Sequence, residues 1–138
     1  MTRPFHWVLA RETSDEHPHV PVPRVTRMRL DVSFVHDDDL NYEGVFIVDA
    51  ESADDLWFQR ALTFDEQDRD LGQDTYCLGR AGAAHYGGVL SWTVEQGLFQ
   101  LELVEAAAQV LELPVTFHLP IDGPAGELLR ANLPRILA

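Results

Sequence analysis

Regular alternation of apolar and polar side chains is the feature that most constrains the fold of this chain. Between Val25 and Val35 ("VTRMRLDVSFV"), every second residue from Met28 to Phe34 is apolar, and charged or small polar residues stand between them. Successive side chains of a β-strand point to opposite faces, so this pattern predicts a strand with one buried and one solvated face. Residues 98–104 ("LFQLELV") repeat the pattern. Further strands are predicted at residues 42–50, 56–62, 75–79, 85–94 and 115–120.

The pattern changes to a helical one late in the chain. Residues 105–113 ("EAAAQVLEL") are rich in helix formers, and Pro114 should end this helix. A second helix is predicted in residues 122–138, with Asp122 as its N-cap and Pro134 as a kink or interruption near its end. Its apolar stripe, at a spacing of four and three residues, consists of Leu129, Leu133 and Ile136.

Strands first and helices late favour an α+β fold over a parallel α/β fold. We predict a mostly antiparallel β-meander sheet with the two late helices packed on one face. The 138 residues suit one domain, with residues 25–138 as its core and residues 1–24 as an N-terminal extension that ends in a proline-rich connection. No apolar run approaches the roughly 20 residues that span a bilayer, and no signal-peptide pattern is present, so we expect a cytoplasmic protein.

The negative charge of the chain is concentrated in its middle. The net charge is −13, and residues 37–74 hold thirteen acidic residues against two arginines, Arg60 and Arg69. Such a field repels nucleic-acid phosphates and anionic lipids, so neither nucleic acid nor a membrane is an expected partner. It would accelerate encounter with a basic protein, although charge that serves only solubility is the alternative.

The strongest part of this charge lies in residues 65–74 ("DEQDRDLGQD"). Five carboxylates within ten residues cannot be buried together, so the segment is predicted to be an exposed loop. Its spacing differs from that of an EF-hand, which leaves a solvated hairpin loop or a docking surface for a protein. The candidate partner-binding residues are Asp65, Glu66, Asp68, Asp70 and Asp74, together with Asp37, Asp38 and Asp39.

Neither catalysis nor metal binding has a clear signature. Cys77 is the only cysteine and follows the acidic loop, which would raise its pKa, so a buried small apolar residue is the favoured interpretation. His17 and His19 form an H-x-H pair in the proline-rich stretch, but no third ligand completes a metal site. We therefore predict no metal, no cofactor and no catalytic residue.

Two adjacent glycines stand out in "HYGGV". A pair of residues without side chains early in a strand indicates a bulge or the close approach of another backbone. We expect Tyr86, Gly87 and Gly88 to form a structural motif at a strand start, with at least one glycine at positive φ or packed against a neighbouring backbone.

The order of these features resembles the immunity protein 10 family of bacterial polymorphic-toxin systems. An acidic loop leads into "DTYCL", then "YGGV", then "LELVEAAAQVLEL" and a leucine-rich C-terminal helix, so that the resemblance covers roughly residues 43–138. It implies a non-enzymatic protein that is made beside a secreted toxin and blocks it. From charge alone, the toxin would be basic and the acidic surface would bind it. The alternatives are a small enzyme that uses residues 65–77 and a homodimeric scaffolding module.

Overall fold

The computed structural model describes residues 30–138. The predicted extension at residues 1–24, the H-x-H pair and the beginning of the first predicted strand lie outside the described residues. The elements follow in the order β1 (Leu30–Asp37), β2 (Tyr42–Asp49), β3 (Asp55–Ala61), α3 (Glu66–Asp70), β4 (Cys77–Arg80), β5 (Ala83–Tyr86), β6 (Val89–Glu95), β7 (Leu98–Leu103), α4 (Glu105–Leu111), β8 (Thr116–Pro120) and α5 (Gly123–Ile136). The predicted α+β class with antiparallel strands is confirmed.

The meander is divided into two sheets. Strands β1 to β5 form a five-stranded antiparallel sheet in sequence order, and β6, β7 and β8 form a three-stranded antiparallel sheet. The division falls at Gly87 and Gly88, between β5 and β6. Both glycines have positive φ, 70° and 111°, so the chain leaves the first sheet through a conformation that residues with a Cβ rarely adopt.

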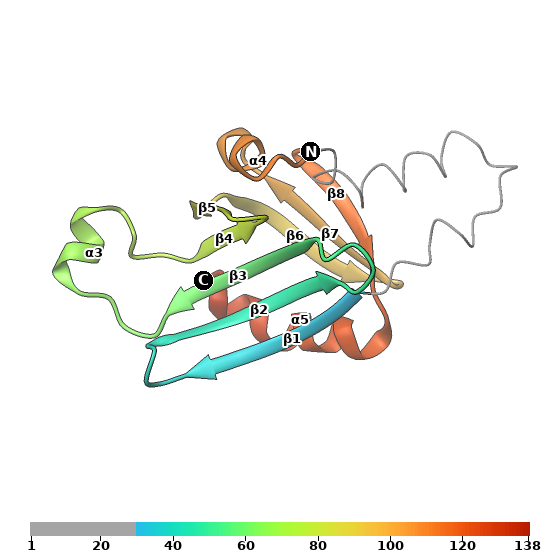
Figure 1. The fold of residues 1–138 in the computed structure, drawn as a ribbon, viewed down its shortest axis with the longest axis horizontal. Helices are drawn as coiled ribbons and strands as arrows, with labels where there is room; N and C mark the ends of the chain where they lie inside the picture. Colours follow the sequence, from blue (N-terminus) through green and yellow to red (C-terminus); the bar gives the residue numbers. More distant parts are fainter. Residues whose placement is uncertain (1–29) are drawn as a thin grey trace, which may run out of the picture.

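The core lies between the two sheets and is closed by the late helices. Phe58 of β3 meets Phe99 of β7 in an edge-to-face contact, with ring centroids 6.1 Å apart. Helix α5 packs on the same inner face of the five-stranded sheet, and Figure 1 shows it behind β1 to β3. The predicted apolar stripe of α5 is fully buried and consists of Leu129, Leu133 and Ile136.

Helix α4 covers the other end of the same inner face. It contacts β5, and its buried residues are Ala107, Ala108 and Leu111. Buried Arg80 of β4 donates hydrogen bonds to the carbonyl oxygens of Leu111 (3.1 Å) and Glu112 (3.2 Å), which ties the helix end to the sheet. Both late helices thus lie on one face of the sheet, as predicted.

Three local predictions need correction. The strand predicted at residues 85–94 is divided into the end of β5 and most of β6, which belong to different sheets. Residues 66–70 form the short helix α3 within the predicted acidic loop, because Asp65 and Asp68 each accept a hydrogen bond from the backbone N–H of the other in a capping box. Pro134 does not interrupt α5, which continues to Ile136.

Between residues 30 and 138, no helix combines the length and the apolar character that a membrane span needs.

Candidate functional site

The two acidic stretches of the sequence lie together at one end of the molecule. Asn41, in the turn after Asp37–Asp39, accepts a backbone hydrogen bond from Leu62 (3.1 Å), and its side-chain amide exchanges two with Thr63 (both 3.2 Å). These bonds join the β1–β2 turn to the segment that carries α3. We call residues 37–41 and 63–75 together the acidic end; it contains eight carboxylates and one arginine, Arg69.

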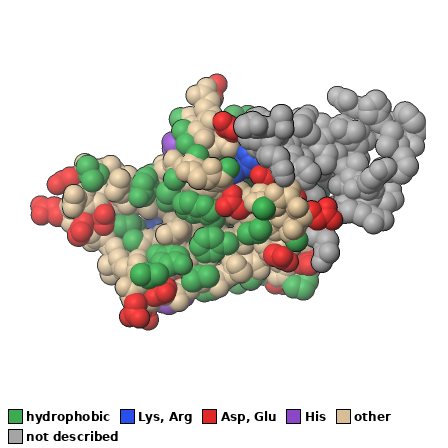
Figure 2. All heavy atoms as spheres, viewed as in Figure 1, with side chains coloured by type: hydrophobic (Ala, Val, Ile, Leu, Met, Phe, Trp, Pro, Cys, Tyr) green, Lys and Arg blue, Asp and Glu red, His purple; other side chains and the backbone are tan. Residues whose placement is uncertain are grey.

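Most carboxylates of the acidic end are exposed. Asp37 and Asp68 are half-buried because each stabilises the local backbone: Asp37 accepts a hydrogen bond from the backbone N–H of Leu40 (3.0 Å), and Asp68 belongs to the capping box. The other six face solvent, namely Asp38, Asp39, Asp65, Glu66, Asp70 and Asp74. Red side chains gather at the left end of the face in Figure 2, around α3 and the β1–β2 turn.

Three further acids of residues 37–74 are buried and structural. Asp49 accepts hydrogen bonds from the backbone N–H of Glu51 (3.0 Å) and the hydroxyl of Ser52 (2.9 Å), and so shapes the β2–β3 turn. Asp54 lies 3.6 Å from the guanidinium of buried Arg80. Glu43 binds Arg135. Within the acidic segment, some carboxylates therefore support the fold and others supply surface charge. The sequence analysis did not distinguish these two groups.

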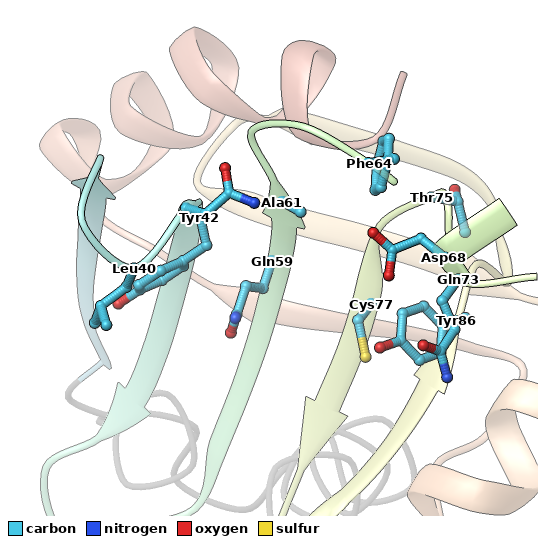
Figure 3. A pocket seen from close by; sticks show the side chains of 11 residues that line it. Leu40, Tyr42, Gln59, Ala61, Phe64, Asp68, Gln73, Thr75, Cys77 and Tyr86 are labelled. Carbon is cyan, nitrogen blue, oxygen red and sulfur yellow. The ribbon is translucent and has the colours of Figure 1, made fainter. Parts of the chain in front are cut away.

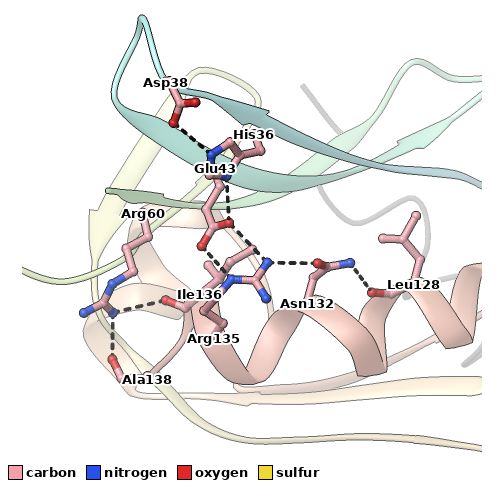
Figure 4. A network of polar contacts seen from close by, with 9 residues as sticks. All are labelled: His36, Asp38, Glu43, Arg60, Leu128, Asn132, Arg135, Ile136 and Ala138. Carbon is pink, nitrogen blue, oxygen red and sulfur yellow. Dashed lines mark hydrogen bonds and ion pairs between the residues drawn. The ribbon is translucent and has the colours of Figure 1, made fainter. Parts of the chain in front are cut away.

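Glu43 is the centre of a polar network beside the acidic end (Figure 4). Hydrogen bonds from Arg135 are the main reason that its pKa lies below the ordinary value of 4.5. His36 contacts Glu43 (3.4 Å) and Asp38 (3.0 Å), and the hydrogen bond to Asp38 is the largest cause that raises the His36 pKa above 6.5. A histidine with a raised pKa thus stands at the base of the acidic turn.

A hollow of about 300 Å³ opens on the outer face of the five-stranded sheet, within the acidic end. The β1–β2 turn bounds one side, the 63–75 segment bounds the other, and β3, β4 and β5 form the floor. Gln59, Cys77 and Tyr86 are direct cross-strand neighbours in this floor. Figure 3 shows the carboxylate of Asp68 directed from α3 over the space between β3 and β4. Asp68, a predicted partner-binding residue, and Cys77, for which a buried apolar role was predicted, thus line one cavity.

Cys77 lies half-buried in this hollow, and burial raises the pKa of its thiol. A thiol with a raised pKa carries little of the thiolate that acts as a nucleophile, so the environment does not activate Cys77. Burial is also the largest cause that raises the pKa of Tyr86, and the nearby Cys77 and Asp68 add to it. The thiol of Cys77 and the hydroxyl of Tyr86 are therefore neutral, hydrogen-bonding groups in the lining of the hollow.

The outer face around the hollow is aromatic. By strand register, Tyr42 and Phe46 of β2 and Trp57 of β3 point to this face, away from the core. The ring of Trp57 lies over Gly79 so closely that a Cβ there would stand 1.8 Å from it. On the outer face of the three-stranded sheet, by contrast, the exposed residues, such as Gln100, are mostly polar. Figure 2 shows hydrophobic side chains over the middle of the first face. Sequence reasoning did not separate these aromatic residues from the core.

The glycine pair lies outside the hollow. Gly88 packs against α4, where a Cβ would come 2.7 Å from that of Ala107, while Gly87 donates a backbone hydrogen bond to the carbonyl of Tyr76 (2.8 Å). The pair links β5 to β6, and neither glycine is among the residues that line the hollow. No cluster of three or more histidine, cysteine or acidic residues in the described part of the chain has the arrangement of a metal site.

These features define an α+β fold with one strongly acidic end and an aromatic sheet face opposite to the one that α4 and α5 cover. Residues 30–129 match the family model of immunity protein 10, and the chain belongs to this family. The match begins at β1, earlier than the predicted resemblance, and confirms the family. Neither the curated proteins nor the solved structures include a significant match to the chain.

Proposed function

We propose that this chain is a non-enzymatic immunity protein that binds a cognate toxin domain in the cytoplasm and neutralises it through the acidic end. The single observation that carries this proposal is the family match over residues 30–129. The acidic end is the surface that we propose for binding, because of its charge. The two segments that flank the hollow carry eight carboxylates, of which Asp68 lines the hollow itself, and such a surface would complement a basic, partly apolar one.

Binding is better supported than catalysis. An enzyme built on residues 65–77 would need an activated group in the hollow, but burial raises the pKa of Cys77 and the capping box engages Asp65 and Asp68. The acidic field disfavours nucleic acid and anionic lipid as partners and favours a basic protein. A toxin with a basic cleft, such as a nuclease that binds phosphates, fits this surface. The alternative is homodimerisation through a sheet face, which the sedimentation experiment below distinguishes from toxin binding.

The first experiment is co-purification with the toxin domain encoded by the neighbouring gene. We expect a one-to-one complex and loss of toxin activity on binding. Sedimentation of the chain alone should show a monomer at micromolar concentration. A neighbouring gene product that does not bind, or a stable dimer that uses the aromatic face, would overturn the proposal.

The second experiment tests the acidic end. Glu66, Asp70 and Asp74 are exposed, and their side chains make no hydrogen bond or ion pair with the described part of the chain. Their replacement by the neutral amides should leave the Tm unchanged or slightly higher, because self-repulsion falls. It should slow association with the toxin by about tenfold at low salt and flatten the dependence of the rate on ionic strength.

The matched control removes the same charge elsewhere. Glu95, Glu102 and Glu127 are exposed on β6, β7 and α5, and their replacement by glutamine changes the net charge equally. We expect this triple variant to associate with the toxin nearly as fast as the unmodified chain. Equal slowing in both triple variants would mean that net charge alone drives association and that the acidic end is not the interface.

A further inference from the structure

The residues that line the hollow combine aromatic rings with hydrogen-bond acceptors. The hollow combines tyrosine rings, Tyr42 and Tyr86, with a set of hydrogen-bond acceptors that includes the carboxylate of Asp68 and the amide oxygens of Gln59 and Gln73. No arginine, lysine or histidine is among its lining residues. A cavity rich in acceptors and aromatic faces, with no cation of its own, suits a positively charged donor.

Asp68 is positioned to accept a hydrogen bond from such a donor. It is half-buried, and the capping box uses its Oδ2 atom, which accepts the backbone N–H of Asp65 at 3.0 Å. The Oδ1 atom is thereby left for a ligand. Figure 3 shows Asp68 on one side of the hollow and Tyr42 on the opposite side, with Gln59 on the floor between them. A planar group in this space can meet a carboxylate, an amide oxygen and a ring together.

We propose that the hollow receives an arginine side chain of the toxin, an inference that rests on the proposed function. A guanidinium is planar, carries five N–H donors and stacks on aromatic rings, whereas the ammonium of lysine is a compact, strongly hydrated charge. An anion would face the eight carboxylates of the acidic end, and an apolar side chain would bury Asp68 without compensation. The volume of about 300 Å³ is at the small end of ligand pockets and suits one long side chain.

The surface around the hollow fits the same occupant. The aromatic residues Phe46 and Trp57 continue from its floor along the outer face and offer apolar contact to the backbone around the inserted arginine. Interfaces commonly combine such an apolar area with a few buried arginine and tyrosine anchors. The hollow is therefore the anchor point, and the acidic end steers the approach.

The test uses the full chain, labelled with ¹⁵N, and acetyl-Gly-Arg-Gly-amide as the probe. We expect the peptide to shift the backbone amides of Asp68, Gln73, Cys77 and Tyr86, with a dissociation constant in the millimolar range. The same peptide with citrulline keeps the shape of arginine and loses its charge, and it should bind about tenfold more weakly. A lysine peptide should lie between the two.

Two variants locate the effect. Asp68→Asn keeps an acceptor for the capping box and loses the charge, and Tyr86→Leu keeps an apolar side chain and loses the ring. Each should weaken binding of the arginine peptide about three- to tenfold. Glu95→Gln, on the polar face of the three-stranded sheet, should leave it unchanged. Equal binding of the citrulline peptide, shifts located elsewhere, or no shift at millimolar peptide would overturn the inference.

Titration of the toxin domain separates this inference from the proposed function. If the toxin binds the unmodified chain, Asp68→Asn and Tyr86→Leu equally well, the function stands and the hollow is not the anchor point. If the arginine peptide binds as expected and the toxin does not bind at all, the arginine site stands and the proposed function falls. A dimer that dissociates in the Tyr86→Leu variant would assign the hollow to a second copy and overturn the inference.

Discussion

Glu43 of β2 and Arg135 of α5 form a two-point ion pair across 92 residues of sequence. The Nε and Nη2 atoms of Arg135 donate to Oε2 and Oε1 of Glu43 at 2.8 and 3.1 Å, and Glu43 is only 5% exposed. Arg135 also stacks on Phe34, 5.6 Å from the ring centroid. The pair holds the last turn of α5 against the sheet directly beneath the acidic end.

We predict that Glu43→Gln lowers the free energy of unfolding by about 1–3 kcal/mol, because it removes a charge-assisted pair from a buried position. Glu127→Gln is the matched control, since its pair with Arg130 (3.1 Å) is exposed and contributes little. Urea denaturation monitored by circular dichroism measures both. An equal loss of unfolding free energy in the two variants would show that the Glu43–Arg135 pair contributes no more than an exposed pair.

We predict that His36 stabilises the fold more in mild acid than in base. Its folded pKa is raised above 6.5, so its contribution is complete below 6.5 and is lost as the pH rises through the folded value. The difference in unfolding free energy between the unmodified chain and His36→Gln should therefore be larger at about pH 5.5 than at about pH 8.

Glu43 acts in the opposite direction: its pKa is lowered, so its contribution to the unfolding free energy is lost as the pH falls below 4.5.

Asp38→Asn serves as the control for the histidine, because the hydrogen bond that Asp38 accepts from His36 is the largest cause of the raised His36 pKa. NMR titration of His36 in this variant should give a pKa closer to 6.5. An unchanged His36 pKa would contradict the assignment of the shift to Asp38.

We predict that Gly88→Ala destabilises the fold more than Gly87→Ala. At Gly88, φ is 111° and a new Cβ would collide with Ala107 at 2.7 Å, so backbone strain and overpacking add to about 2–4 kcal/mol. Gly87 has φ 70°, and a Cβ there would meet only Thr75, at 4.0 Å, so only the left-handed conformation adds a cost, of about 1–2 kcal/mol. Thermal and urea unfolding of both variants give the comparison, and a reversed order would refute the role of the α4 contact.

We predict a large effect at buried Arg80. Arg80→Met removes the guanidinium that lies 3.6 Å from Asp54 and donates to two carbonyl oxygens at the end of α4, and it should cost about 3–5 kcal/mol. The double variant with Asp54→Leu should recover part of this loss, because the buried carboxylate of Asp54 is then not left without its arginine. Additive losses in a double-mutant cycle would contradict the coupling of the two residues.

Much of the fold could be predicted from local patterns. Alternation identified the strands and the antiparallel α+β class, and the spacing of Leu129, Leu133 and Ile136 identified the buried side of α5. These predictions succeed because the period of a strand or a helix is set by the backbone itself. The family, too, could be recognised from the order of short motifs.

The candidate site was only half predictable. The exposure of the acidic residues followed from the cost of burying many like charges, but their number overstated the surface charge, because Glu43, Asp49 and Asp54 are buried. Charge density along a chain does not show which carboxylates have a distant partner. For Glu43 that partner, Arg135, is near the other end of the chain.

By itself, the sequence determined most of the strands, the two late helices, the α+β class and the exposed character of residues 65–74, because each depends on neighbours along the chain. Only the tertiary structure decided that residues 37–41 and 63–75 meet around one hollow and that Phe46 and Trp57 face outward. Alternation shows that two residues lie on opposite faces of a strand, but it does not show which face the helices cover. That depends on where the chain returns, and here α4 and α5 both return to the inner face of the five-stranded sheet.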